Sequence, residues 1–124
     1  MKRIIAAAVL MVFIISSYLG GYFYIKKTCE DTEKIVKECV SAYEEQKNIK
    51  LYTTKLENYW SSKEKILSVV TNHNAIDEVE HAIESLTVHS KYPQNQMFYE
   101  YSSTLEILLH QIMEDTAFGM HSIM

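Results

Sequence analysis

Apolar residues first form one unbroken run and then recur at helical spacing. Residues 4–25 contain no charged side chain. Beyond them, apolar positions recur three or four residues apart, which is the period of one face of an α-helix. The chain has three glycines and one proline, Pro93, and so few turn-forming residues favour long helices over many short strands. The pattern predicts an all-α protein.

Four apolar stripes follow the N-terminal run. The first comprises Ile35, Val36, Cys39, Val40 and Tyr43. The second comprises Ile49, Tyr52, Leu56, Tyr59, Ile66 and Val70, with Lys63 as a polar break and with Trp60 and Leu67 beside it. The third comprises Ile76, Val79, Ile83 and Leu86. The fourth comprises Phe98, Tyr101, Leu105, Leu108 and Ile112, with Leu109 and Met113 adjoining.

Alternating spacings of three and four residues suit antiparallel helices that pack at shallow angles. We expect the helices to break near residues 47–49, at residues 72–74, and at residues 90–95, because proline does not fit inside a helix. The stripes therefore predict a small antiparallel bundle of three to four helices over residues 28–124. Trp60, flanked by Tyr59 on a stripe, is expected in the core.

The N-terminal run has the layout of a transmembrane helix. Lys2 and Arg3 precede it, and Lys26 and Lys27 follow it. Its 22 residues, 4–25, would rise about 33 Å as a helix, enough for a hydrocarbon core of roughly 30 Å. Three tyrosines toward its C-terminal end suit the lipid–water boundary. We predict an N-terminal membrane anchor over residues 1–27, with residues 4–25 in the lipid bilayer.

The alternative for this segment is a cleaved signal peptide. Its basic start and apolar core fit, but the best approximation to a small-residue cleavage site is Leu19 with Gly21, so an uncleaved signal-anchor is favoured. The lysines and arginine at the two flanks favour, by a small margin, a cytoplasmic N-terminus. The expected location is the cell membrane, single-pass, with the helical body outside the cytoplasm.

The charge of the body disfavours nucleic-acid binding. Beyond residue 25, ten lysines and no arginine stand against sixteen carboxylates, which leaves a net charge of about −6. Such a surface is a poor match for phosphate backbones.

Nucleophile-elbow, P-loop, HExxH and glycine-rich dinucleotide motifs are absent from the sequence. We therefore expect a non-enzymatic protein without a cofactor.

Residues 72–86, NHNAIDEVEHAIESL, raise the question of a metal site. His73, Asp77, Glu80 and Glu84 are spaced i, i+4, i+7 and i+11, so they share one side of a helix that reaches back to His73. Nitrogen and carboxylate ligands on one face could hold zinc or a similar ion. These four residues are the candidate metal ligands, and they support an alternative function as an extracytoplasmic ligand- or metal-binding sensor.

A simpler interpretation of the same stretch is a capped helix start. Asn74 could accept the first backbone N–H bonds, and Asp77, three residues on, stands where a capping carboxylate belongs. Ile76, Val79 and Ile83 would then face the core. In this interpretation every residue has a structural role, and no ligand is needed.

The leading functional hypothesis is a protein-interaction or structural module at the cell envelope. The first stripe is narrow, and Ile35, Val36, Cys39, Val40 and Tyr43 could pair with the body, with an unidentified protein partner or with a second copy of the chain. We treat these five residues as interaction candidates.

Cys29 and Cys39, ten residues apart, would lie about 15 Å apart on one helix, too far for a disulfide with each other.

The segment LENYWSSKEKILSVVTNHNAIDEVEHAIESL, residues 56–86, resembles a bacterial family of small proteins, the domain-of-unknown-function family four-three-six-three. The matching positions are Leu56, Trp60, Glu64, Asn72, His73, Ile76, Asp77 and Glu80. The later stretch LLHQI, residues 108–112, resembles the second leucine-rich helix of that family. The resemblance implies a short N-terminal membrane span and a helical body, and it implies no activity, cofactor or catalytic residue.

Overall fold

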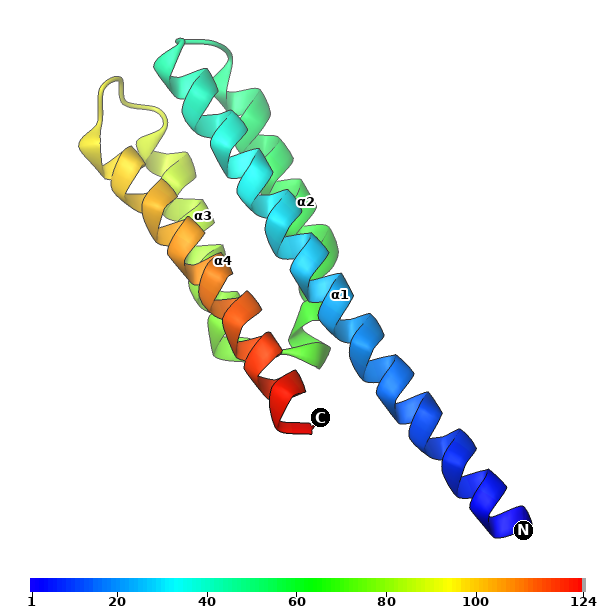
Figure 1. The fold of residues 1–124 in the computed structure, drawn as a ribbon. Coiled ribbons are helices and arrows are strands. Elements are labelled where there is room, and N and C mark those ends of the chain that lie inside the picture. Colours follow the sequence, from blue (N-terminus) through cyan, green and yellow to red (C-terminus); the bar gives the residue numbers. More distant parts are fainter. Residues whose placement is uncertain (124) are drawn as a thin grey trace.

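The computed structural model describes the backbone of residues 1–123 and the side chains of residues 1–69 and 71–116. Over residues 1–123 the chain forms four helices (Figure 1): α1 (Lys2–Glu44), α2 (Ile49–Val70), α3 (His73–His89) and α4 (Gln96–Ile123). The predicted all-α class is confirmed, and the breaks fall within two residues of the expected positions. The side chain of Val70, assigned to the second stripe, lies outside the described part.

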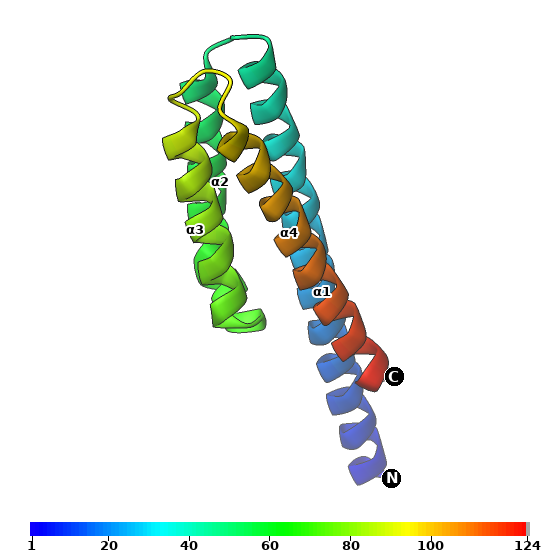
Figure 2. The same cartoon turned by 90° about the vertical axis from the view of Figure 1, so that its left-hand side faces the viewer.

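The helices run up and down in sequence order and form an antiparallel bundle. Helix α1 packs against α2 and α4, and α3 packs against the same two helices. Two perpendicular views show α4 running back along α1, so that its C-terminal end lies beside the N-terminal half of α1 (Figures 1 and 2). This ring of neighbours is the arrangement of a four-helix bundle joined by short loops.

The core is built from the predicted stripes of all four helices. Its largest fully buried side chains include Val36, Leu56, Trp60, Ile76, Leu86, Phe98, Leu105 and Leu109. Trp60 is only 2% exposed, which confirms the core position expected for it. Burial of large apolar side chains from every helix is the main favourable contribution to folding.

The predicted stripe is wrong in the second half of α2. Ile66, which was assigned to the stripe, is 51% exposed, whereas Leu67 is buried. The buried row runs through Thr53, Leu56, Trp60 and Leu67. Two neighbouring rows of this helix are apolar, and periodicity alone does not say which row faces the partner helices.

The start of α3 differs by two residues from the expected one. The helix begins at His73, and Asn72 is the N-cap residue. The Asn72 side-chain oxygen accepts a hydrogen bond from the Asn74 backbone N–H at 2.9 Å. The prediction that Asn74 caps the helix is therefore wrong, because the preceding asparagine takes the extended cap conformation and leaves Asn74 inside the first turn.

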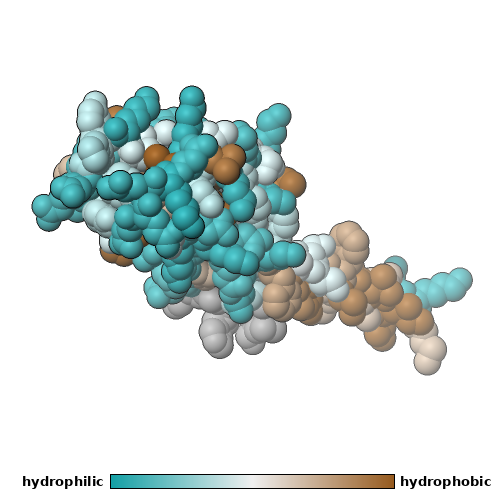
Figure 3. Space-filling model, turned by 90° about the horizontal axis from the view of Figure 1, so that it is seen from above, coloured by the Kyte–Doolittle hydropathy of each residue, from teal (hydrophilic) through white to brown (hydrophobic). Residues whose placement is uncertain are grey.

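Helix α1 is continuous from the apolar run into the core. Residues 2–18 are exposed along their whole length, and the N-terminal part of this segment projects beyond the other helices in Figures 1 and 2. A space-filling view shows hydrophobic residues over this projection and hydrophilic residues over the bundle (Figure 3). Among the described residues, α1 is the helix long and apolar enough to cross a membrane by length and composition.

The bundle begins earlier than residue 28. Ile25 is only 1% exposed and belongs to the core cluster, although the sequence suggested an anchor up to residue 27. The apolar run is therefore divided between two surroundings. Its first part projects from the bundle, and its last part is covered by other helices of the same chain.

The opposite end of α1 is clamped by the loop between α3 and α4. The Tyr43 hydroxyl donates a hydrogen bond to the Tyr92 carbonyl and accepts one from the Asn95 backbone N–H at 2.7 Å. The Tyr43 ring stacks on Phe98, with ring centroids 4.0 Å apart. One side chain thus fixes the register of α1 against α4.

Candidate functional site

Three carboxylates converge where α2 meets α3. Oxygen atoms of Glu64, Asp77 and Glu80 lie within 4.8 Å of one another, and all three side chains are partly exposed. Asp77 and Glu80 are one turn apart on α3, and Glu64 comes from the antiparallel α2. Oxygen ligands of this kind suit hard divalent cations such as Ca²⁺ or Mg²⁺ better than they suit zinc.

The cluster holds like charges close together. A hydrogen bond with Glu64, followed by partial burial and by repulsion from Glu64 and Asp77, raises the pKa of Glu80 above its ordinary value. Two neighbouring carboxyl groups share a proton more readily than they ionise together. The contact with Glu64 therefore favours the protonated form of Glu80 more than an isolated glutamate would.

The structure brings together two of the four predicted metal ligands. Asp77 and Glu80 are in the cluster, and His73 lies at its edge, with its Nε2 atom 3.9 Å from Asp77 Oδ2. Glu84 instead has a carboxylate oxygen 3.9 Å from the ring of His81. His73 and Glu84 are outside the group of ligands found among the described side chains.

Glu64 was missed because periodicity within α3 carries no information about α2. The signal that could have found it was the family pattern, in which Glu64 stands with Asp77 and Glu80. Antiparallel pairing of α2 and α3 across a short turn brings positions at similar distances from that turn to the same level.

The predicted interaction stripe on α1 is covered by the chain itself. Ile35, Val36 and Cys39 are buried in the core cluster, and Val40 and Tyr43 are partly buried against it. Of the alternatives left open by the sequence, the structure shows pairing with the body. This face is therefore closed to a partner while the bundle is folded.

The two cysteines are buried and free. Burial, with a smaller contribution from neighbouring carboxylates, raises the pKa of each thiol to about 12. The thiolate is the reactive form of cysteine. Neither side chain has the exposure or the acidity of a nucleophile or of a bridge to another chain.

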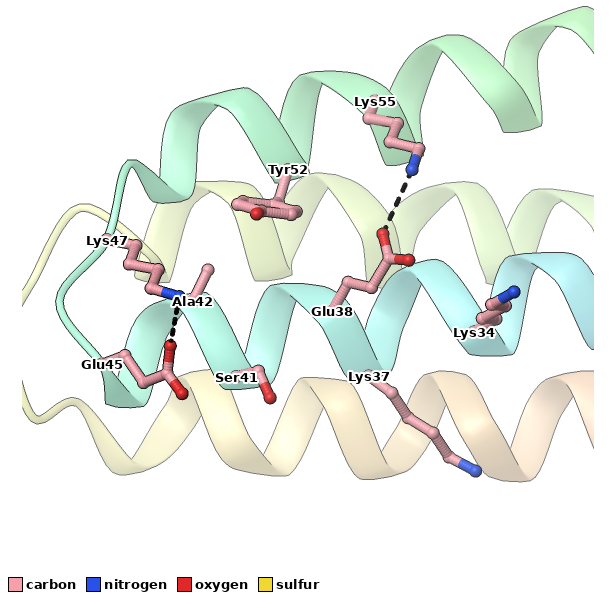
Figure 4. Close-up of a pocket in the computed structure, with 9 residues that line it drawn as sticks. All are labelled: Lys34, Lys37, Glu38, Ser41, Ala42, Glu45, Lys47, Tyr52 and Lys55. Atoms are coloured by element: carbon pink, nitrogen blue, oxygen red, sulfur yellow. Dashed lines mark hydrogen bonds and ion pairs between the residues drawn. The ribbon is translucent and has the colours of Figure 1, made fainter.

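An open groove lies between α1 and α2 at the end of the bundle far from the N-terminus. It encloses about 570 Å³ and is lined by Lys34, Lys37, Glu38, Ser41, Ala42, Glu45, Lys47, Tyr52 and Lys55 (Figure 4). Two ion pairs cross or border it, Lys55–Glu38 at 3.1 Å and Lys47–Glu45 at 2.8 Å. Four lysines and two glutamates line this groove, and Lys37 also pairs with Glu33 at 3.5 Å, so the lining has a small positive excess on an acidic chain.

The fold and these sites define a helical bundle carried on a long apolar helix. A family model described as a domain of unknown function, DUF4363, matches residues 19–123. The chain therefore belongs to the DUF4363 family, as the resemblance over residues 56–86 indicated. No curated protein and no solved structure matches the chain.

Proposed function

We propose that the protein is a non-enzymatic, single-pass membrane protein that holds a helical bundle at the surface of the cell envelope. One observation carries this proposal: the exposed apolar segment and the buried core segment belong to one continuous helix, α1. An exposed helix without charge over most of its length is stable in lipid and unfavourable in water.

The experiment that tests this proposal is extraction of the full chain from membranes with alkaline carbonate. The variant Leu10→Arg/Val12→Arg places two charges in the projecting segment, where each costs about 3 kcal/mol in the bilayer centre. The matched control is Leu51→Arg, because Leu10 and Leu51 are both 63% exposed, but Leu51 lies on the bundle. We expect the wild type and the control to stay with the membrane and the double variant to be released. Extraction of the wild type would contradict the proposal.

The bundle offers a charged groove between α1 and α2 for a protein partner. Lys34 and Lys37 are exposed on its α1 side, and Ser41 lies beside them. Positive charge on an acidic protein favours an acidic segment of another protein. The groove thus replaces the buried stripe at residues 35–43 as the surface proposed for contact.

Site-specific photocrosslinking tests this contact. A photoreactive residue at Ser41 is expected to capture one discrete partner band, and Lys34→Glu/Lys37→Glu is expected to abolish it. The control position is Ser103, which is exposed on α4. Equal capture from both positions, or a band insensitive to the charge reversal, would contradict a role for the groove.

A further inference from the structure

At the end of the bundle next to the projecting segment, parts of α1 and α2 lie at one level. We call this end the base, and it comprises residues 22–27 of α1 and residues 63–72 of α2 and the following turn. The Lys63 Nζ atom lies 5.5 Å from the centre of the Tyr24 ring. Thr71 and Asn72 line a cavity of about 690 Å³ whose α1 wall runs from Phe13 to Ile25. The α2–α3 turn is therefore level with the second half of the apolar run.

Apolar and basic side chains follow the same order on both helices of the base. On α1, exposed Phe23 is followed by exposed Lys26 and Lys27. On the antiparallel α2, Lys63 and Lys65 precede exposed Ile66 and Val69, and Val69 is 84% exposed. In each case the apolar side chains lie nearer the projecting segment. Lys26 and Lys63 lie about one turn, or roughly 5 Å, farther from it than Phe23 and Ile66, whereas Lys65 is adjacent to Ile66.

The length of the projecting segment places the base against a bilayer. Lys2 and Arg3 are charged, so the hydrocarbon span begins near residue 4, and the exposed residues 4–18 rise about 22 Å as a helix. A hydrocarbon core is about 30 Å thick, so a transmembrane α1 must use about five further residues, up to about residue 23. Tyr22 is also a wall of the cavity that contains Thr71 and Asn72. The base consequently meets the membrane boundary when α1 crosses the bilayer.

We propose that the base docks on the phospholipid headgroups of the membrane that α1 crosses. Phe23, Ile66 and Val69 would contact the start of the acyl chains. Lys26, Lys27, Lys63 and Lys65 would lie at the level of the lipid phosphates. This inference rests on the proposed membrane anchoring, and it adds a second contact that is made by the bundle itself.

The charges around the base favour the α1–α2 side as the docked side. Lys63 packs over the rings of Tyr24 and Tyr59, and Lys65 is exposed. Of the nearby carboxylates, Glu64 gathers with Asp77 and Glu80 on the α3 side, whereas Asp115 of α4 lines the same cavity as Tyr22 and Thr71. Apolar side chains flanked by lysines are typical of surfaces that contact lipid phosphates.

Depth-dependent fluorescence quenching of the full chain in vesicles tests this inference. Single cysteines Leu10→Cys, Val69→Cys and Gln46→Cys are labelled with an environment-sensitive dye, while the buried native thiols stay unlabelled. The vesicles contain phosphatidylcholine and phosphatidylglycerol, with spin labels either near the headgroups or deep in the acyl chains. Lys65→Glu is added to the Val69 probe, and Lys50→Glu, at the other end of α2, is its control.

The inference predicts deep quenching at position 10, shallow quenching at position 69 and none at position 46. Lys65→Glu should reduce the quenching at position 69, and Lys50→Glu should leave it unchanged. If position 10 is quenched while position 69 behaves like position 46, the docking is wrong and the anchoring stands. In that case the exposed apolar side chains of the base would be assigned to contact with another protein. If position 10 is not quenched, the anchoring itself fails and the docking fails with it.

Discussion

The hydroxyl group of Tyr43 accepts a hydrogen bond from the backbone N–H of Asn95 at 2.7 Å. The two residues are 52 positions apart in sequence. Since the same hydroxyl also donates to the Tyr92 carbonyl, one side chain joins the end of α1 to the loop that contains Pro93. This contact closes the bundle at the end opposite the projecting segment.

Tyr43→Phe should destabilise the bundle by about 1–2 kcal/mol. The substitution keeps the ring on Phe98 and removes only the hydroxyl, which leaves a partly buried N–H without its partner. Tyr99→Phe is the control, because its ring also contacts Tyr43 but is partly exposed at the surface. Urea unfolding of the full chain in detergent measures the difference. Equal stability of the two variants would contradict the clamp.

Gln46→Gly should stabilise the protein by about 1 kcal/mol. Gln46 follows the C-cap of α1 with a φ of 56°, a left-handed conformation that costs a residue with a Cβ atom roughly this amount. The backbone N–H of Lys47 bonds to the Ala42 carbonyl at 2.9 Å, as in a helix-terminating turn. Gln46→Val should have the opposite effect on the melting temperature. A glycine variant no more stable than the wild type would count against this backbone conformation.

Cys29 and Cys39 should resist maleimide in the folded protein and react in denaturant. At pH 8, a thiol pKa of about 12 in place of 9.0 lowers the thiolate fraction about a thousandfold, and burial blocks access as well. Ser41→Cys, exposed on the same helix, supplies the reactive control. Labelling of the native cysteines at the rate of position 41 would contradict their burial.

Glu80→Gln should raise stability at neutral pH and flatten its dependence on pH. The folded state raises the pKa of Glu80, so it binds more protons than the unfolded chain above the ordinary glutamate value. Stability is therefore greatest below that value and is lost as the pH rises through the folded pKa. Melting temperatures from pH 4 to 8 measure this loss. Glu78→Gln, exposed on the same helix, should retain the full pH dependence.

Metal binding at Glu64, Asp77 and Glu80 tests the alternative function as a metal-binding sensor. A cation that binds only the folded state must raise its stability. The sensor alternative includes His73, which lies outside the cluster, so we expect no rise in melting temperature with calcium, manganese or zinc that is lost in His73→Ala. A rise with one ion that disappears in Glu64→Gln but persists in His73→Ala would instead establish a carboxylate site for that ion.

The fold could be predicted from the sequence to the level of helices and their breaks. Helical spacing and Pro93 determine where helices begin and end, since these signals are local. Sequence did not show which of two apolar rows on α2 faces inward, and Ile66 was misplaced for that reason. It also did not show that Asn72 caps α3, because two asparagines two positions apart both satisfy the cap preference.

The candidate sites were harder to predict, because they depend on neighbours that are distant in the chain. Glu64 meets Asp77 and Glu80 only after α2 and α3 pair. Ile25 looked like part of the membrane span, because an apolar residue suits lipid and core equally well. Only the positions of α2 and α4 show at which residue of α1 the exposed segment ends and the buried segment begins.

Hydrogen–deuterium exchange of the full chain in lipid nanodiscs tests most directly whether anchor and core are one helix. The account predicts slow exchange without interruption through residues 4–44, including the junction at residues 19–27. Fast exchange confined to that junction would show a hinge between a separate anchor and the bundle. Fast exchange throughout residues 4–18 would show that this segment is not in the bilayer. Either result would contradict the central claim.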